Sequence, residues 1–271
     1  MDDAAVLAAR RDRPGDSDDP VPVEALNAGG GAPYVINCDH ASHAIPRAYD
    51  NLGLDEGALG RHIAWDIGAG ELVRRLSVSL DAIAVLAGVS RLVIDCNRAL
   101  DSPASILSQS DGVQVPGNAG LDAAEAARRA EHYFWPYHRA VDAAIEGVLE
   151  RGDIPALIAV HSFTPEMDGM ARPWHIGILW DLDTRLARRL IGILGAEDEI
   201  VVGENEPYSG REDAGFSMHH HGGRRGIPNV LIEVRQDLIA SPAGVERWAA
   251  VLDGALRRVL AETGPFRVER P

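Results

Sequence analysis

Histidine side chains follow two apolar segments of the chain, a pattern that can bring metal ligands together. Residues 34–38 begin with β-favouring side chains, and His40 comes two positions after them. Residues 156–160 form a second apolar run, which leads directly into His161. We expect both runs to be strands, and open α/β sheets hold ligands at the carboxyl ends of their strands. Two histidines at two such ends predict a metal site better than either histidine alone.

A histidine and an aspartate one helical turn apart form a second candidate pair of ligands. Residues 58–79 carry apolar residues at helical spacing, which predicts a helix that includes His62 and Asp66. Side chains at positions i and i+4 lie on the same side of a helix and can approach one metal ion together. The alternative is a solvated pair that stabilises the helix by only about a few tenths of a kcal/mol.

One carboxylate interrupts an apolar run near the end of the chain. Residues 229–235 have the composition of a buried strand, and Glu233 lies inside it. A buried glutamate is costly unless it is paired or has a function. Glu233 is therefore the strongest candidate for a catalytic acid or base.

Asn97 and Arg98 follow residues 92–94, which we expect to form another strand. An arginine can bind a carboxylate through two parallel hydrogen bonds, so this pair could anchor an acidic substrate. The alternative is a structural ion pair between Arg98 and Asp95 or Asp101.

These candidate residues need a sheet whose strand ends meet at one edge. Strands and helices alternate along the chain, which predicts an α/β fold with a mostly parallel sheet and helices on both faces. His40, His161 and Glu233 would then converge on one edge of the sheet. The expected strands cover residues 34–38, 82–87, 92–94, 156–160, 176–180, 200–202 and 229–235, and the expected helices cover residues 58–79, 121–151, 183–194 and 242–260.

The composition restricts the class of protein. The 271 residues carry a formal charge of −15, from 26 Lys and Arg against 41 Asp and Glu, which argues against a nucleic-acid partner. The length suits one core, so we expect a single domain at residues 31–271 after a flexible segment at residues 1–30. We expect Cys38 and Cys96 to lie inside strands, as small buried thiols of a protein in a reducing cytoplasm. No apolar stretch approaches about 20 residues, so we expect no membrane span.

Several segments of the chain together resemble the N-formylglutamate amidohydrolase family. They are CDHASHAIP (38–46), HIAWDIGA (62–69) with SRLVIDCNR (90–98), VHSFTP (160–165) and NVLIEVRQDLI (229–239). The resemblance implies a three-layer αβα sandwich similar to zinc-dependent exopeptidases and muramoyl amidases. It also implies hydrolysis of the amide bond of an N-acyl amino acid such as N-formylglutamate. Differences around His40 and in residues 62–69 are typical of a sister branch whose substrate need not be N-formylglutamate.

The same resemblance gives the candidate residues specific roles. Zn²⁺, or another divalent metal, would be held by His40, His161 and either Asp66 or His62, with an open position for the attacking water. Glu233 would take a proton from that water and pass it to the leaving amine.

Other residues would bind the substrate or orient the ligands. Asn97 and Arg98 would hold a substrate carboxylate, and either Arg91 or His221 would help to polarise the amide oxygen. Histidine ligands need a second hydrogen-bond partner. The candidates for that partner are Asp39, Asp95 and Glu206, and Glu206 and His221 are also candidate substrate-binding residues. His43 has the spacing of a further ligand but is expected only beside the metal site.

Two other classes of function remain open from the sequence. A metallopeptidase or cell-wall-type amidase on the same scaffold would need a wide groove, whereas an amidohydrolase of small substrates would have arginines closing a small pocket. A non-enzymatic amino-acid-binding protein would bind its ligand without metal and without need of Glu233.

Overall fold

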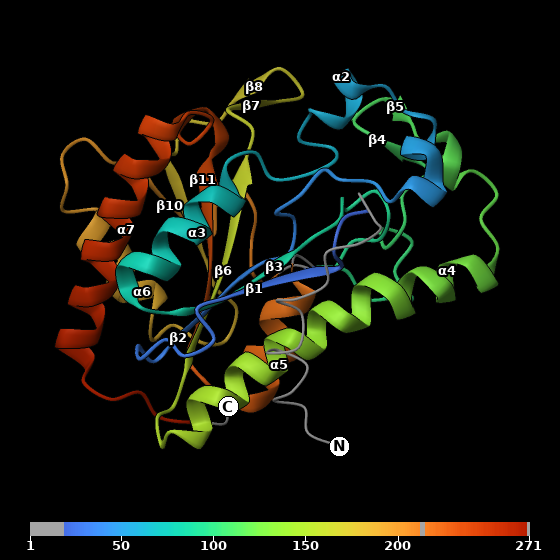
Figure 1. Ribbon diagram of the computed structural model, residues 1–271. Coiled ribbons are helices and arrows are strands. Elements are labelled where there is room, and N and C mark those ends of the chain that lie inside the picture. Colours follow the sequence, from blue (N-terminus) through green and yellow to red (C-terminus); the bar gives the residue numbers. More distant parts are fainter. Residues whose placement is uncertain (1–18, 212–214, 270–271) are drawn as a thin grey trace.

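A seven-stranded mixed sheet forms the centre of the computed structural model, which describes residues 19–211 and 215–269 (Figure 1). The strand order is β1-β3-β2-β6-β11-β9-β10. Strands β3, β2, β6 and β11 are parallel, whereas β1 is antiparallel to β3 and β9 is antiparallel to β11. The strands are β1 (Val23–Leu26), β2 (Tyr34–Cys38), β3 (Ile83–Ala87), β6 (Ala156–Phe163), β9 (Ile176–Leu179), β10 (Val202–Glu204) and β11 (Asn229–Arg235). The mostly parallel α/β sheet predicted from the sequence is confirmed.

Helices cover both faces of this sheet and make three layers (Figure 1). One face packs against α3 (Ala69–Leu80), α6 (Ala187–Leu194) and α7 (Pro242–Thr263), and the other against α5 (Trp135–Glu150). Strand β6 shows how the sequence supports both layers. Ile158 and Val160 belong to the core beneath α3 and α7, whereas Leu157 belongs to the core beneath α5. This two-residue alternation is that of a strand buried on both faces.

Shorter elements complete the fold around the α5 face. A π-helical turn, Ala130–Phe134, joins α4 (Ala123–Arg129) to α5, and a second π-helical turn, η4 (Met218–Gly222), packs against β6 and β11. The remaining elements are the hairpins β4 (Gln109–Ser110) with β5 (Val113–Gln114) and β7 (Glu166–Met167) with β8 (Met170–Ala171), the helix α2 (Glu56–Leu59), and the 3-10 turns η1 (Arg47–Gly53), η2 (Pro116–Asn118), η5 (Gly223–Arg225) and η6 (Gln236–Leu238). Within residues 19–211 and 215–269, no helix has the length and apolar character to cross a membrane.

The region between α2 and α3 corrects one prediction. The sequence predicts a single helix over residues 58–79, but the chain leaves the helix after α2 and turns several times before α3. Gly68 has a φ of +81°, and a Cβ there would lie 2.2 Å from the carbonyl oxygen of Ile239. Because only glycine fits this close approach, the helix cannot pass through it. His62 and Asp66 are therefore not an i, i+4 pair on one helix.

Two further differences concern the edge of the sheet and a buried loop. Residues 92–94 form no strand; they are buried because they belong to a separate apolar cluster, so Cys96 lies in a loop as a buried free thiol. Strand β1 lies inside residues 1–30 and pairs with β3 at the edge of the sheet. Residues 1–18 of that expected flexible segment lie outside the described residues.

Candidate metal centre and active site

The candidate catalytic side chains meet at the carboxyl edge of the sheet, on the face that α5 covers. His40 lies two residues after β2, while His161 and Glu233 lie near the ends of β6 and β11. His161 continues the alternation of Leu157, which packs beneath α5, so it lies on the same face of β6. Glu233 is the register partner of His161 on β11. The sheet thus places both side chains on one face of neighbouring strands.

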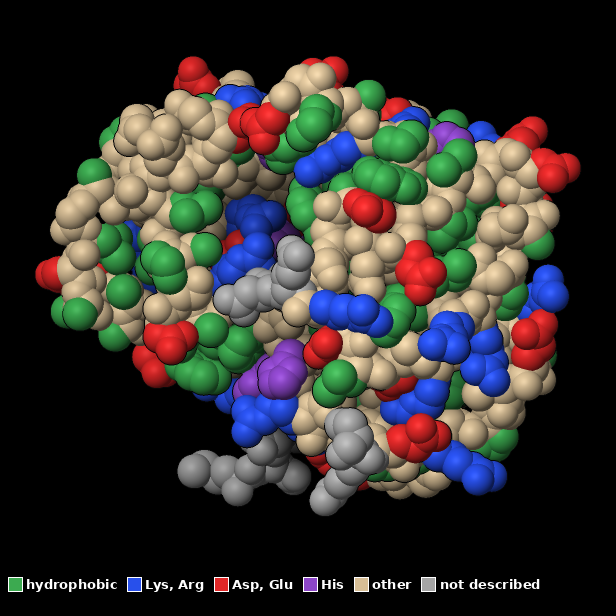
Figure 2. Space-filling model, turned by 180° about the vertical axis from the view of Figure 1, so that it is seen from behind, with side chains coloured by type: hydrophobic (Ala, Val, Ile, Leu, Met, Phe, Trp, Pro, Cys, Tyr) green, Lys and Arg blue, Asp and Glu red, His purple; other side chains and the backbone are tan. Residues whose placement is uncertain are grey.

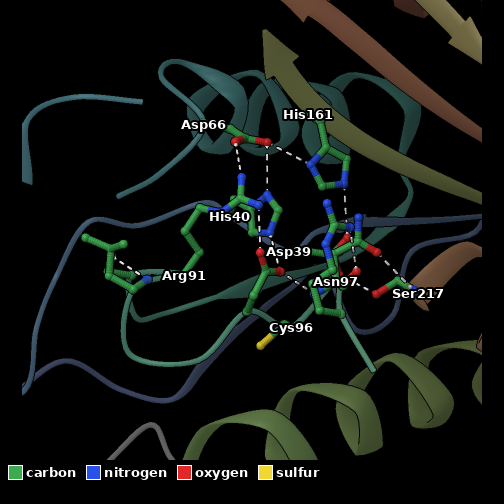
Figure 3. A network of polar contacts seen from close by, with 12 residues as sticks. Asp39, His40, Asp66, Arg91, Cys96, Asn97, His161 and Ser217 are labelled. Carbon is green, nitrogen blue, oxygen red and sulfur yellow. Dashed lines mark hydrogen bonds and ion pairs between the residues drawn. The ribbon is translucent and has the colours of Figure 1, made fainter. Parts of the chain in front are cut away.

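Asp66 lies between His40 and His161 (Figure 3). Its Oδ2 is 2.7 Å from Nδ1 of His161 and 3.3 Å from Nδ1 of His40. The three ligand atoms lie within 4.8 Å of one another, and all three side chains are buried. The turn before α3 holds Asp66 in place, since its backbone N–H donates to the His40 carbonyl at 2.9 Å. Two imidazole nitrogens and one carboxylate oxygen are the donor set of many hydrolytic zinc sites.

The remaining ring nitrogens of the two histidines face two further carboxylates. Nε2 of His40 is 2.7 Å from Oδ1 of Asp95, and Nε2 of His161 is 3.1 Å from Oδ2 of Asp39. When each Nε2–H donates to its carboxylate, each Nδ1 presents a lone pair toward Asp66. This is the orientation that metal-ligating histidines require. Asp39 and Asp95 are two of the three partners that the sequence predicts for this purpose.

The charges of the site favour a cation. Three buried carboxylates, Asp39, Asp66 and Asp95, contact the two histidines, and the guanidinium of Arg91 pairs with two of them, Asp66 and Asp95. Burial alone would raise the pKa of Asp66, but the two imidazoles beside it lower that pKa below its usual value. Burial would lower the pKa of His161, whereas hydrogen bonds to Asp39 and Asp66 raise it well above its usual value. The carboxylates thus draw protons onto the histidines, and a divalent cation would supply the same positive charge.

Arg91, Asn97 and Ser217 hold the carboxylates that face the histidines (Figure 3). Arg91 donates to Oδ2 of Asp95 at 2.6 Å, and the backbone N–H of Asn97 donates to Oδ1 of Asp95 at 2.8 Å. Ser217 donates its hydroxyl to Asp39, and its backbone N–H donates to Oδ1 of Asn97 at 3.1 Å. Asn97 therefore holds Asp95 and Ser217 in place, in addition to any contact with substrate. Ser217 is not a candidate from the sequence, because a single serine in a loop carries no pattern.

Glu233 is a buried carboxylate with one oxygen left for chemistry. Glu233 is 7% exposed, and its Oε2 has no hydrogen-bond partner among the described residues. Burial raises the pKa of Glu233 to about 7. Tyr208, which the sequence does not single out, lies in the same neighbourhood, because burial and then the charge of Glu233 raise the pKa of its hydroxyl. A carboxyl with a pKa near neutrality can both accept and return a proton.

The structure places four other candidates away from this centre. His62 faces Asp111, with 3.6 Å between Nε2 and Oδ2, so of the two alternatives only Asp66 lies with His40 and His161. His43 packs against the ring of Trp65, with 4.8 Å between ring centroids. The side chain of Glu206 is exposed on the loop after β10, and His221 is fully buried between His138 and Asp142. Among the described residues, no hydrogen bond or ion pair joins Glu206 or His221 to His40, Asp66 or His161, so their role in substrate binding stays a prediction.

A cavity of about 820 Å³ begins beside Asn97 and Arg98. Nη1 of Arg98 donates to the Asn97 carbonyl at 3.1 Å, so the guanidinium is held at the cavity wall. Figure 2 shows a hollow on this face, with basic side chains inside it and histidine side chains near its rim. The charged lining comprises four arginines, Arg98, Arg185, Arg211 and Arg224, and three acids, Asp181, Asp183 and Glu269. The lining is therefore of mixed charge, with an excess of one positive side chain, and Asn97 and Arg98 link it to the centre because His40, Asp66, His161 and Glu233 do not line it.

A three-layer α/β sheet that carries such a polar centre at its carboxyl edge is the architecture of a hydrolytic enzyme. Comparison with known proteins gives the family. The N-formylglutamate amidohydrolase family profile matches residues 32–240, and the chain belongs to this family of amidohydrolases. The search of curated protein sequences gave no significant match.

Two solved structures share the fold over nearly the whole chain. The gene product Atu2144 from Agrobacterium tumefaciens is 34% identical, with a TM-score of 0.86 over 89% of this chain and 95% of that one. The N-formylglutamate amidohydrolase from Ralstonia eutropha JMP134 is 19% identical, with a TM-score of 0.61 over 88% of this chain and 97% of that one.

Proposed function

We propose that this protein is a metal-dependent amidohydrolase that cleaves the amide bond of N-acyl amino acids with an acidic side chain, such as N-formylglutamate. The observation that carries the proposal is the contact of His40, Asp66 and His161 beside the buried carboxylate of Glu233. Membership of the N-formylglutamate amidohydrolase family supports the reaction class. The two buried free thiols are consistent with an enzyme of the cytoplasm.

The donor set fits a divalent cation, and zinc best. His40 and His161 would bind it through Nδ1 and Asp66 through Oδ2, while Asp95 and Asp39 would fix the two rings from the opposite side. When bound, such an ion would polarise the substrate carbonyl and lower the pKa of a water molecule.

Glu233 would act as the general base and then as the general acid. Its free Oε2 would accept the proton of the attacking water and deliver it to the nitrogen of the leaving amine. The amide C–N bond then breaks to give a carboxylic acid and a free amino acid. Arg91 would stabilise the negative charge that develops on the amide oxygen, because it brings a guanidinium to the same edge of the sheet.

Asn97 and Arg98 would bind the carboxylate of the substrate at the entrance to the cavity. Of the other arginines there, Arg185 is paired with Asp183, and Arg211 lies over the ring of Trp180 at 4.3 Å. The guanidinium of Arg98 at the cavity wall supports a substrate that carries a carboxylate.

The test is a substrate panel on the zinc-loaded protein and on two variants. The panel contains N-formylglutamate, N-formylglutamine, N-acetylglutamate and a muramoyl peptide. We expect cleavage of the N-acylglutamates, with a higher kcat/KM than for the uncharged glutamine analogue. Arg98→Gln should reduce that preference, whereas Arg211→Gln, a change in the same cavity, should retain it.

Two outcomes would contradict the proposal. Cleavage of the muramoyl peptide alone would favour a cell-wall-type amidase. Tight binding of an amino acid by both wild type and Glu233→Gln, with no turnover of any compound, would favour a binding protein.

A further inference from the structure

A second cluster of metal-competent side chains lies where α5 contacts η4. Asp142 and His138 come from successive turns of α5, and His220 and His221 come from η4. One ligand atom from each of Asp142, His220 and His221 lies within 4.8 Å of the others. None of these residues belongs to the centre formed by His40, Asp66 and His161.

The hydrogen bonds of His138 determine which ring nitrogen of His221 carries a proton. Nε2 of His138 is 3.0 Å from the carbonyl oxygen of Cys96, which can only accept, so His138 carries its proton on Nε2. His138 is buried against the rings of Phe134 and Phe216, and no acidic side chain among the described residues contacts it, so this ring is neutral and its Nδ1 is an acceptor. His221 lies 2.8 Å from that Nδ1 through its own Nε2 and must therefore donate to it.

The other nitrogen of His221 then faces an acceptor. Its Nδ1 is 2.9 Å from Oδ1 of Asp142. If His221 were neutral with its proton on Nε2, the lone pair of its Nδ1 would face a lone pair of Oδ1 of Asp142. Because such a contact is repulsive, the position between His221 and Asp142 requires a positive charge, which is either a second proton on the ring or a metal ion.

His220 makes the metal ion the better occupant. Its ring stacks on Phe216 with a centroid distance of 4.7 Å and an angle of 17°, which fixes its orientation beside the other two ligands. The ring is half-buried and faces the other two ligands, so it can bind a metal ion as a neutral imidazole. Two ligand atoms bound to one tetrahedral zinc at about 2.0–2.1 Å each lie about 3.3–3.4 Å apart, so the 2.9 Å contact between His221 and Asp142 would widen by about 0.4 Å when zinc binds.

The surroundings order the carboxylate and leave the cluster open to solvent. Arg225 donates to Oδ1 of Asp142 at 2.8 Å and to Oε1 of Glu146 at 2.6 Å. The guanidinium therefore positions Asp142 while Glu146 offsets its charge. The side chain of Asp142 is 38% exposed and His220 is half-buried, so an ion can reach the cluster from the surface. Because Arg225 competes for the same oxygen, we expect weaker binding here than at the first centre.

We propose that Asp142, His220 and His221 form a second zinc-binding site, separate from the catalytic centre and closed from inside by His138. Two imidazoles with one carboxylate are a ligand set typical of zinc. The proposal concerns this cluster alone and does not depend on the function proposed above.

The experiment counts zinc on the full-length protein. Each protein is stripped with chelator and dialysed to equilibrium against zinc, and the bound metal is measured by elemental analysis. We expect two zinc ions per chain in the wild type, one in His220→Ala, and two in His219→Ala, where the neighbouring exposed histidine is removed. Asp142→Asn should also hold one, which provides a second variant that keeps the shape of the side chain and retains all the histidines.

A variant of the first centre separates the two proposals. His40→Ala with His161→Ala should retain one zinc, and adding His220→Ala should remove it. Suppose that the wild type binds one zinc and that His40→Ala with His161→Ala binds none. This result would overturn the second site and mean that the positive charge beside Asp142 is a proton on His221. Two zinc ions that persist in His220→Ala would overturn it as well. One zinc that disappears only in His220→Ala would support the second site while the first centre fails.

Discussion

Glu233 and His161 lie directly beside each other on the neighbouring parallel strands β11 and β6, in matched register. His161 is a candidate ligand, and Glu233 has an oxygen without a hydrogen-bond partner among the described residues. Because adjacent parallel strands keep their side chains at a fixed spacing, the sheet holds the proposed base at a set distance from the proposed metal. A site on rigid strands of this kind needs little reorganisation during reaction.

Glu233→Gln should abolish most of the activity without loss of the fold. Glutamine keeps the shape of the side chain but cannot accept the proton, so we expect kcat to fall by about 10²–10⁴. The raised pKa of Glu233 means that its ionised form is costly to bury, so the variant should be at least as stable as the wild type at pH 8. Turnover, zinc content and chemical denaturation would be measured together. Unchanged kcat with zinc bound would exclude Glu233 as the base.

The pH dependence of kcat/KM should have an acid limb that belongs to Glu233. The proposed base must be ionised, so activity decreases as the pH falls through its pKa. Burial raises that pKa to about 7, and a nearby bound cation would lower it, so the limb of the zinc-loaded enzyme should lie below about 7. A pH–rate profile at saturating zinc would locate it. If the residual activity of Glu233→Gln shows the same limb, another group is responsible.

The parts of the site that lie on strands could be predicted from the sequence. The apolar run before His40 and the one that contains Glu233 have the bounds of β2 and β11, because period and composition mark buried parallel strands directly. The convergence of their ends then follows from the topology of a parallel sheet. The sequence does not show Ser217 or Tyr208, since Ser217 reaches the site from the start of η4 and Tyr208 from a loop, and the positions of both depend on the whole fold.

The wrong predictions concern segments that are apolar and buried but form no regular helix or strand. The apolar spacing of residues 58–79 continues through a turn because Ile63 is buried in a separate apolar cluster, and residues 92–94 are apolar for the same reason. The consecutive histidines carry no directional signal in the sequence. In the structure His219 is exposed, while His221 is fully buried against His138. Both residues lie in η4, where successive side chains point in different directions around the helix axis.

Zinc binding at the first centre should release protons. Hydrogen bonds and charges from neighbouring aspartates raise the pKa of both His40 and His161 despite their burial. In the metal-free protein, the protonated histidines stabilise the fold fully below about pH 6.5, the pKa of histidine in the unfolded chain. This stabilisation is lost as the pH rises through the higher pKa values of the folded state. Zinc must displace these protons, so its affinity should increase with pH in the neutral range.

Calorimetry in buffers of different ionisation enthalpy would measure this release. We expect a buffer-dependent binding enthalpy for the wild type and for His220→Ala, which retains the first centre. An enthalpy independent of the buffer would mean that both rings are already neutral in the metal-free protein.

Gly68→Ala should weaken both the fold and the first metal centre, because the turn at Gly68 positions Asp66. The residue has a φ of +81°, and a new Cβ would lie 2.2 Å from the Ile239 carbonyl oxygen. Gly112→Ala is the matched control: its φ is +73°, but nothing lies within 4 Å of the new Cβ. The control should lose about 1 kcal/mol of unfolding free energy from backbone strain alone, and Gly68→Ala should lose clearly more. Zinc affinity should fall only in Gly68→Ala, and equal losses in both variants would show that the contact with Ile239 does not hold Asp66 in place.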